Sequence, residues 1–274
     1  MREAALNDRS RMNILPSILK ACGYELISSK KVARRKARRL EQEAALTIEH
    51  QLSKVLAKLE INCVIDVGAN AGQYGTLLRE LGFQGRIVSF EPVSSSFERL
   101  KEEAGADPDW YVYPFALGSE TCSRDINRME NSVLSSFLDP SEQAKRYLAR
   151  ESHVVEREMV PMKRLDEIFL ELIEGLSPAR CYLKIDTQGF DLEVLRGSTS
   201  CLSRISGLQA ELSFVPLYQG MPTYLEALAA FQEAGFEATG FYPIWHLENL
   251  QIVEMDCVMI REEAPGATEQ PPGR

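Results

Sequence analysis

An apolar strand that leads directly into a glycine-spaced turn constrains this chain most strongly. The strand covers residues 62–67, includes the acid Asp66, and is followed by Gly68, Gly72 and Gly75. Glycine lacks a Cβ atom, so the backbone can approach a ligand closely or adopt a positive φ angle at these positions. The apolar run is too short to span a membrane. The pattern predicts a parallel strand with a nucleotide-type ligand over its carboxyl end.

A second predicted strand ends on Glu91, 23 residues after Gly68. A carboxylate at this place suits a ribose, because both ribose hydroxyls can donate hydrogen bonds to it. Three ligands compete. A dinucleotide-binding turn favours a G-x-G start, and a Walker-type phosphate loop needs Gly-Lys-Ser/Thr. This sequence has neither motif. S-adenosylmethionine carries a sulfonium cation and no phosphate, so Asp66 favours it. The alternative is that Asp66 and the glycines only shape a turn.

Composition narrows the class of protein and of partner. The chain has 274 residues, is 45% hydrophobic and carries a net charge of −9, which argues against general nucleic-acid affinity. One segment departs from this balance: from Lys30 to Arg39 it holds seven cations and no acid. We expect either a solvated helix face or a contact with an anionic lipid surface or a phosphorylated carrier substrate.

The sequence also gives an expectation about compartment. It shows no charged-then-apolar leader and no apolar run of about 18 residues. The six cysteines have neither C-x-x-C nor paired Cys/His metal spacing. We therefore expect a cytoplasmic protein, at most peripheral to the inner membrane face.

From residue 62 onward, strand patterns alternate with helical patterns, which is typical of an α/β fold with a parallel sheet. The expected strands lie near 62–67, 86–91, 110–115, 181–186, 208–214, 236–242 and 252–260. The expected helices lie near 48–59, 73–81, 95–104, 190–203 and 222–234. The link between the last two strands is too short for a helical crossover, so they should form an antiparallel hairpin. The predicted fold is a Rossmann-like class I methyltransferase fold, a seven-stranded mostly parallel sheet with a C-terminal hairpin.

We expect the chain to consist of an appendage, a domain that contains this sheet and an insert, and a tail. Residues 1–48 form a helical, basic appendage, and residues 49–262 form the methyltransferase domain. The polar insert 118–180, with short strands near 122–127 and 154–160, is predicted to be an acceptor lid, because loops at strand ends commonly carry specificity. The tail 263–274 has nothing to bury and is expected to be disordered.

Several ordered motifs resemble the FkbM-type S-adenosylmethionine-dependent methyltransferases over residues 62–261. They are Asp66-Val-Gly-Ala-Asn-Ala-Gly-Gln-Tyr-Gly75, Phe90-Glu-Pro92, Ala116-Leu-Gly118, Asn131-Ser-Val-Leu-Ser-Ser136, Lys184-Ile-Asp-Thr-Gln-Gly189, Glu193-Val-Leu-Arg-Gly197 and Glu211-Leu-Ser-Phe214. The resemblance implies an O-methyltransferase acting on sugar or polyketide hydroxyls. The family more often shows Val-Glu where this chain has Thr187-Gln188, and Glu where it has Asp191.

The resemblance also implies roles for individual residues in binding the cofactor. The methionine end would meet Asp66, Gly68, Asn70 and Gly72. Tyr74 and Asp186 are further candidate cofactor-binding residues. Glu91 would bind the ribose. The adenine would lie between Pro92 and Val93 on one side and Ala116 and Leu117 on the other.

Methyl transfer from a sulfonium needs an oxygen nucleophile placed in line, and a group that accepts or relays its proton. Asp186, with Lys184 two residues before it, is the first choice of base, and the alternative is a structural ion pair. Glu211 could orient the acceptor or act as a second base, or bond to neighbouring loops. His246 and His153 are further candidates, although a single histidine is more often a packed or surface residue.

Other roles in the insert and at the strand ends stay open. Asp186, Glu211 and Asp166 could hold Mg²⁺, since hard oxygen ligands suit it, whereas cysteine and histidine are not spaced for zinc. Ser132, Ser135 and their neighbour Asn131 could donate to the cofactor or the sugar, or simply cap a loop.

The sequence thus predicts S-adenosylmethionine-dependent O-methylation of a sugar hydroxyl in a glycolipid, saccharide or glycosylated natural product. The alternatives are an NAD- or nucleotide-sugar-dependent oxidoreductase and a non-catalytic S-adenosylmethionine-binding partner subunit. No nucleic-acid partner is expected, because the chain is acidic and lacks the Asn-Pro-Pro-Tyr or Asp-Pro-Pro-Tyr tetrapeptide of amine methylation.

Overall fold

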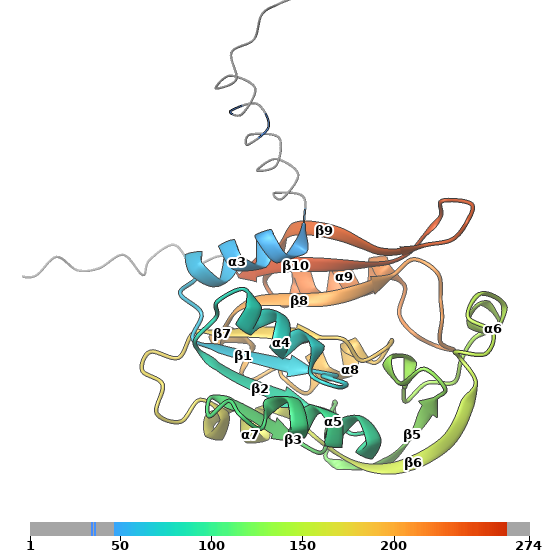
Figure 1. Ribbon diagram of the computed structural model, residues 1–274, viewed down its shortest axis with the longest axis horizontal. Helices are drawn as coiled ribbons and strands as arrows, with labels where there is room; N and C mark the ends of the chain where they lie inside the picture. Colours follow the sequence, from blue (N-terminus) through green and yellow to red (C-terminus); the bar gives the residue numbers. More distant parts are fainter. Residues whose placement is uncertain (1–33, 35, 37–46, 262–274) are drawn as a thin grey trace, which may run out of the picture. The chain divides into compact units, whose positions relative to one another are not determined.

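The computed structural model describes residues 34, 36 and 47–261 (Figure 1). The chain divides into two compact units, Met1–Thr47 and Ile48–Arg274, and the fold below is that of the second unit. Most of the basic segment from Lys30 to Arg39, and the tail 263–274, lie outside the described residues.

A seven-stranded sheet forms the centre of this unit, in the order β3-β2-β1-β7-β8-β10-β9 (Figure 1). Its strands are β1 (Cys63–Val67), β2 (Arg86–Phe90), β3 (Trp110–Tyr113), β7 (Cys181–Ile185), β8 (Ile205–Ser213), β9 (Phe236–His246) and β10 (Ile252–Arg261). The first five pair in parallel, and β10 pairs antiparallel with both β8 and β9. The predicted α/β fold and C-terminal hairpin are confirmed.

Helices cover both faces of the sheet because strand side chains alternate between them. Ile65 and Leu183 face one core and Val64 and Tyr182 face the other, and all four are buried. The first core is completed by α7 (Leu165–Leu172), α8 (Asp191–Arg196) and α9 (Tyr224–Glu233). The second is completed by α3 (Ile48–Lys58), α4 (Gln73–Glu80) and α5 (Ser94–Ala104).

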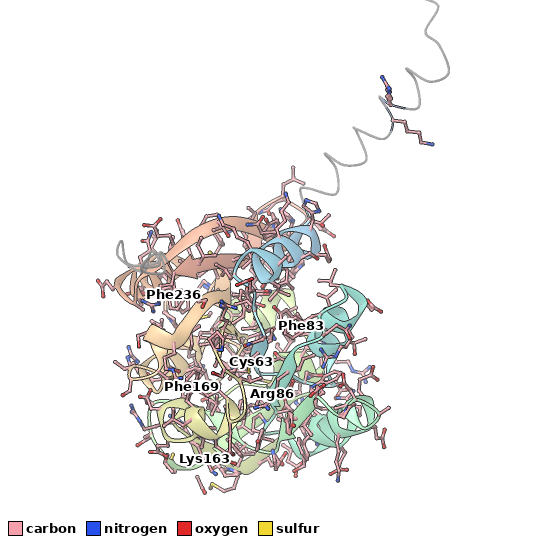
Figure 2. All side chains as sticks on the ribbon, turned by 90° about the vertical axis from the view of Figure 1, so that its left-hand side faces the viewer. Cys63, Phe83, Arg86, Lys163, Phe169 and Phe236 are labelled. Atoms are coloured by element: carbon pink, nitrogen blue, oxygen red, sulfur yellow. The ribbon has the colours of Figure 1, made fainter. Side chains whose placement is uncertain are left out.

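The segment between β3 and β7 has two parts. Its first part forms a small sheet in the order β4-β6-β5, which lies beside the main sheet in Figure 1. Its elements are β4 (Ala116–Leu117), β5 (Cys122–Met129), the 3₁₀-helix η1 (Ser132–Leu134), α6 (Glu142–Tyr147) and β6 (Val154–Lys163). Its second part is α7, whose Leu165, Phe169 and Leu172 belong to the main core; Phe169 is labelled in Figure 2. Because β7 lies parallel to β1, the chain must cross over before it enters β7, and α7 forms part of that crossover. Only the residues up to the end of β6 therefore extend away from the main sheet.

Two further expectations concern membranes and thiols. The helices in the described part of the chain are too short or too polar to cross a bilayer.

Cys63, Cys181 and Cys257 are buried in strands as free thiols, as their apolar surroundings in the sequence predict.

Candidate active site

A cavity of about 420 Å³ lies where the carboxyl ends of β1, β2, β7 and β8 meet. This volume is in the range of small-molecule sites, and the carboxyl edge of a parallel sheet is where such sites form. Many of the residues singled out by the sequence line it together: Gly68, Asn70, Tyr74, Glu91, Pro92, Val93, Ala116, Leu117, Lys184, Asp186 and Glu211.

The turn after β1 packs directly against the turn after β7. Gly68 has a φ angle of +83°, and a Cβ atom there would lie 1.9 Å from the carbonyl oxygen of Asp186. Only glycine permits both the positive φ and this approach. The close packing fixes the position of Asp186 relative to the first turn.

Gly68→Ala is expected to lower the free energy of unfolding by about 1–3 kcal/mol more than Gly82→Ala. Gly82 also has a positive φ, +84°, but a Cβ atom there meets nothing within 4 Å. The pair therefore separates the close approach from backbone strain, and thermal and urea unfolding of both variants measure it. Equal losses would contradict a tight contact between the two turns.

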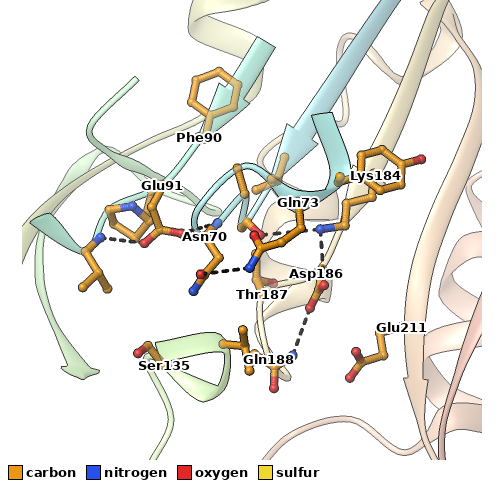
Figure 3. Close-up of a pocket in the computed structure, with 18 of the residues that line it drawn as sticks. Asn70, Gln73, Phe90, Glu91, Ser135, Lys184, Asp186, Thr187, Gln188 and Glu211 are labelled. Carbon is orange, nitrogen blue, oxygen red and sulfur yellow. Dashed lines mark hydrogen bonds and ion pairs between the residues drawn. The ribbon is translucent and has the colours of Figure 1, made fainter. Parts of the chain in front are cut away.

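Glu91 presents a buried carboxylate to the cavity from the end of β2 (Figure 3). Its Oε1 accepts from the amide of Val93 at 2.8 Å, and its Oε2 accepts from the amide of Asn70 at 2.9 Å. Burial raises the pKa of Glu91 to about 7, although these two bonds oppose the shift. Each carboxylate oxygen has a second lone pair, so the ionised group can accept two further donors from the cavity.

The cavity walls beside Glu91 are apolar. They are formed by Phe90, Pro92, Val93, Ala116, Leu117 and Ile126. A hydrogen-bonding carboxylate at the edge of an apolar slot is suited to a group with a flat apolar part and a diol.

A buried polar row crosses the sheet behind the cavity, on the neighbouring strands β3, β2, β1 and β7. The indole N–H of Trp110 donates to Ser89 Oγ at 3.0 Å, and Ser89 donates to Asp66 Oδ2 at 3.2 Å. The ammonium of Lys184 lies 3.2 Å from Asp66 Oδ1, which makes no hydrogen bond to the described residues. Asp66 is fully buried and is not part of the cavity wall. Burial raises the pKa of Asp66, and Lys184 partly offsets this.

Lys184 also pairs with Asp186, whose Oδ2 lies 3.2 Å from its ammonium. Burial would lower the pKa of Lys184, but the Asp186 and Asp66 carboxylates outweigh it and raise the pKa above its usual range. The ring of Tyr74 lies 5.3 Å from the ammonium. Lys184 is therefore a fixed cation between one buried and one cavity-facing carboxylate.

Gln188 joins Asp186 to two distant segments. It has a left-handed φ of +53°, and its Nε2 donates to Asp186 Oδ1 at 2.9 Å (Figure 3). Its side-chain oxygen accepts from the Tyr218 hydroxyl at 2.8 Å, and its carbonyl accepts from the Ser136 hydroxyl at 2.7 Å. A non-glycine residue in this region is held there by its surroundings. Sequence reasoning missed Tyr218, which lies 30 residues away in a loop without a motif.

The insert closes one side of the cavity through η1. The side chain of Asn70 donates to Ser132 Oγ at 3.2 Å, and Arg99 donates to the same oxygen at 3.0 Å. Ser132 and Ser135 line the cavity, whereas Asn131 caps η1 by accepting from the amide of Val133. The serines expected to face a ligand therefore do face the cavity.

Acidic side chains gather at the end of the cavity next to Asp186. Glu211 on β8 faces the cavity (Figure 3), and Asp256, its partner residue on β10, lines it too. Burial, together with the Asp186 and Glu254 carboxylates, raises the pKa of Glu211 well above its usual value. Burial raises the pKa of Asp256 to about 6. Glu254, whose carboxyl group contributes to the shift at Glu211, is 7% exposed, and burial raises its pKa too.

The remaining candidates lie away from the cavity. Gly72 packs against α5 and Trp110. His246 ends β9 and His153 precedes β6, and both are exposed. The Asp166 carboxylate accepts from the amides of residues 200 and 201, so it does not converge with Asp186 and Glu211. Within residues 47–261, no group of three or more His, Cys, Asp or Glu side chains is arranged to hold a metal.

Comparison with known sequences gives two findings. Residues 66–238 match the family described as the methyltransferase FkbM domain. The hexuronic acid methyltransferase AglP of Haloferax volcanii is 29% identical over 149 residues, which is 54% of each of the two chains. The chain thus spans about half the length of that relative.

Comparison with solved structures finds methyltransferases. An rRNA methylase from Streptococcus thermophilus matches with a TM-score of 0.42 and 9% identity, over 78% of this chain and 96% of that one. Aeropyrum pernix fibrillarin, solved with natively bound S-adenosyl-L-methionine, matches with a TM-score of 0.41 and 11% identity, over 73% of this chain and 66% of that one.

Proposed function

The chain belongs to the methyltransferase FkbM domain family, and from this premise we propose that it is an S-adenosylmethionine-dependent O-methyltransferase acting on a sugar hydroxyl. The observation that carries the proposal is one cavity that holds both Glu91 and Asp186. The Glu91 carboxylate can accept hydrogen bonds from a ribose, and the Asp186 carboxylate can accept the proton of an acceptor hydroxyl.

The residues of the cavity fit this cofactor. Glu91 keeps free lone pairs for the two ribose hydroxyls, and the apolar slot beside it suits adenine. The cavity contains acids rather than a cluster of cations, which suits a ligand with a sulfonium and an ammonium better than a pyrophosphate. When bound, S-adenosylmethionine would supply an activated methyl group.

The protein's own contribution to the reaction lies at Asp186. Its carboxylate is 34% exposed, faces the cavity and is held by Lys184 and Gln188. A carboxylate held in this way can accept the proton of an acceptor hydroxyl and keep that oxygen aimed at the methyl group. Glu211, beside it on β8, can hydrogen-bond other hydroxyls of the acceptor.

A sugar acceptor is supported by the relative AglP, whose name gives hexuronic acid as its substrate. It is also supported by the polar end of the cavity, where carboxyl groups can form hydrogen bonds with several sugar hydroxyls. The sugar would belong to a glycolipid, a saccharide or a glycosylated natural product.

S-adenosylhomocysteine is expected to bind this protein and to bind more weakly below pH 7. Glu91 must be ionised to accept both ribose hydroxyls, and its pKa is raised to about 7. The dissociation constant should therefore approach a tenfold rise for each pH unit below that value, and level off above it. Isothermal titration calorimetry between pH 5.5 and 8.5 measures this.

Glu91→Gln should weaken binding and remove its dependence on pH. Glu98→Gln, on the exposed face of α5, changes the net charge equally and should leave both intact. Titrations with NAD and nucleotide sugars test the rival function. Binding of those ligands in preference to S-adenosylhomocysteine would overturn the proposal.

A further inference from the structure

We propose that the acceptor is an uncharged sugar or an amino sugar, and that a uronate is rejected. This rests on the proposed function and concerns the same cavity. The relevant surface is the acceptor wall, which we define as the cavity-facing side chains of Asp186, Glu211 and Asp256.

The acceptor wall is built into the sheet. Asp186 follows β7, Glu211 lies on β8 and Asp256 lies on β10, and the last two are paired in register. A further carboxyl group, Glu254, lies on β10 opposite Ser213 of β8 and is 7% exposed. Three adjacent strands thus present acids to one end of the cavity.

Cations do not balance these acids. Among the described residues, neither Glu211 nor Asp256 forms an ion pair with a lysine or arginine. Lys184 is 3.2 Å from both Asp66 and Asp186, so its charge is already shared between them. Arg99 approaches the cavity at the other end, through Ser132.

The cofactor changes this balance only in part. S-adenosylmethionine carries a sulfonium, an ammonium and a carboxylate, so its net charge can offset one acid of the wall. The remaining carboxyl groups can accept hydrogen bonds from sugar hydroxyls or pair with an ammonium. A uronate would bring a further anion beside them, while Lys184 is already paired with Asp66 and Asp186, and such like-charge contacts are strongly unfavourable.

Binding of matched sugars to the full-length protein saturated with S-adenosylhomocysteine tests this proposal. The probes are methyl glycosides of gluco, manno and galacto configuration, each as the uronate and as the uncharged uronamide, together with methyl glucosaminide. Each pair has nearly the same shape and differs in charge. In at least one configuration, the uronamide should bind on the order of 100-fold more tightly than the uronate. Equal or tighter binding of the uronates, or no binding of any probe, would overturn the proposal.

Asp256→Asn should reduce this preference at pH 8, because the pKa of Asp256 is about 6 and the variant removes one negative charge of the wall while keeping its shape. Glu237→Gln, exposed on β9, is the control and should leave the preference unchanged. The calorimetric titration with S-adenosylhomocysteine keeps the two proposals apart. Failure of the methyltransferase assignment would abolish cofactor binding, whereas failure of the acceptor assignment would leave it intact with a reversed sugar preference.

Discussion

Replacing Asp186 with asparagine is expected to lower kcat for methyl transfer by about 10²–10⁴-fold, the usual contribution of a general base. The substitution keeps the size of the side chain and an oxygen that can accept from Gln188, but removes the group that accepts a proton. The Glu91 end of the cavity is untouched, so the dissociation constant of S-adenosylhomocysteine should change little. Single-turnover assays with an identified sugar acceptor measure the chemical step, and calorimetry measures binding.

Glu211 is the competing base, and its environment argues for a different role. Burial and the neighbouring carboxylates raise its pKa, which favours the protonated form and opposes a role as proton acceptor. Glu211→Gln should therefore affect KM for the acceptor more than kcat. A larger fall in kcat for Glu211→Gln than for Asp186→Asn would reverse the two assignments.

The sheet could be predicted from the sequence because its signals are local. Apolar runs such as the one before Asp66 mark buried parallel strands, and the short link between β9 and β10 permits only a hairpin. Glu91 could be found in the same way, since a strand end and a spacing define it. Asp186, which faces the cavity, could also be found from the sequence, because it directly follows a predicted strand.

The contacts that organise the site could not be predicted, because they join segments far apart in the chain. Tyr218 reaches Gln188 from a loop with no recognisable motif. The sequence predicts residues 118–180 as one polar insert, yet α7 within it is a core helix, and its apolar face finds a partner only because β7 lies beside β1. Asp66 follows the alternation of its strand, which directs it away from the cavity and toward Ser89 and Lys184.

Lys184→Met should destabilise the protein by about 3–5 kcal/mol, the usual effect of removing one partner of a buried ion pair. Asp66 is fully buried, and its Oδ1 depends on the Lys184 charge. Without that charge, the pKa of Asp66 in the folded state rises further above its unfolded value, so folding favours the protonated acid. The loss should therefore be smallest at low pH and grow as pH rises, which urea unfolding at pH 5.5 and pH 8 can measure.

A double variant shows whether the lost stability comes from the unpaired Asp66 charge. Asp66→Asn combined with Lys184→Met removes both charges, and such paired neutral replacements are often close to neutral in stability. Most of the loss should then be recovered, giving a large coupling energy between the two positions. Lys145→Met breaks an exposed pair with Glu142 and should cost less than about 1 kcal/mol. If the double variant is as unstable as Lys184→Met, then Lys184 acts through its packing or through Asp186, and the unpaired Asp66 charge does not cause the loss of stability.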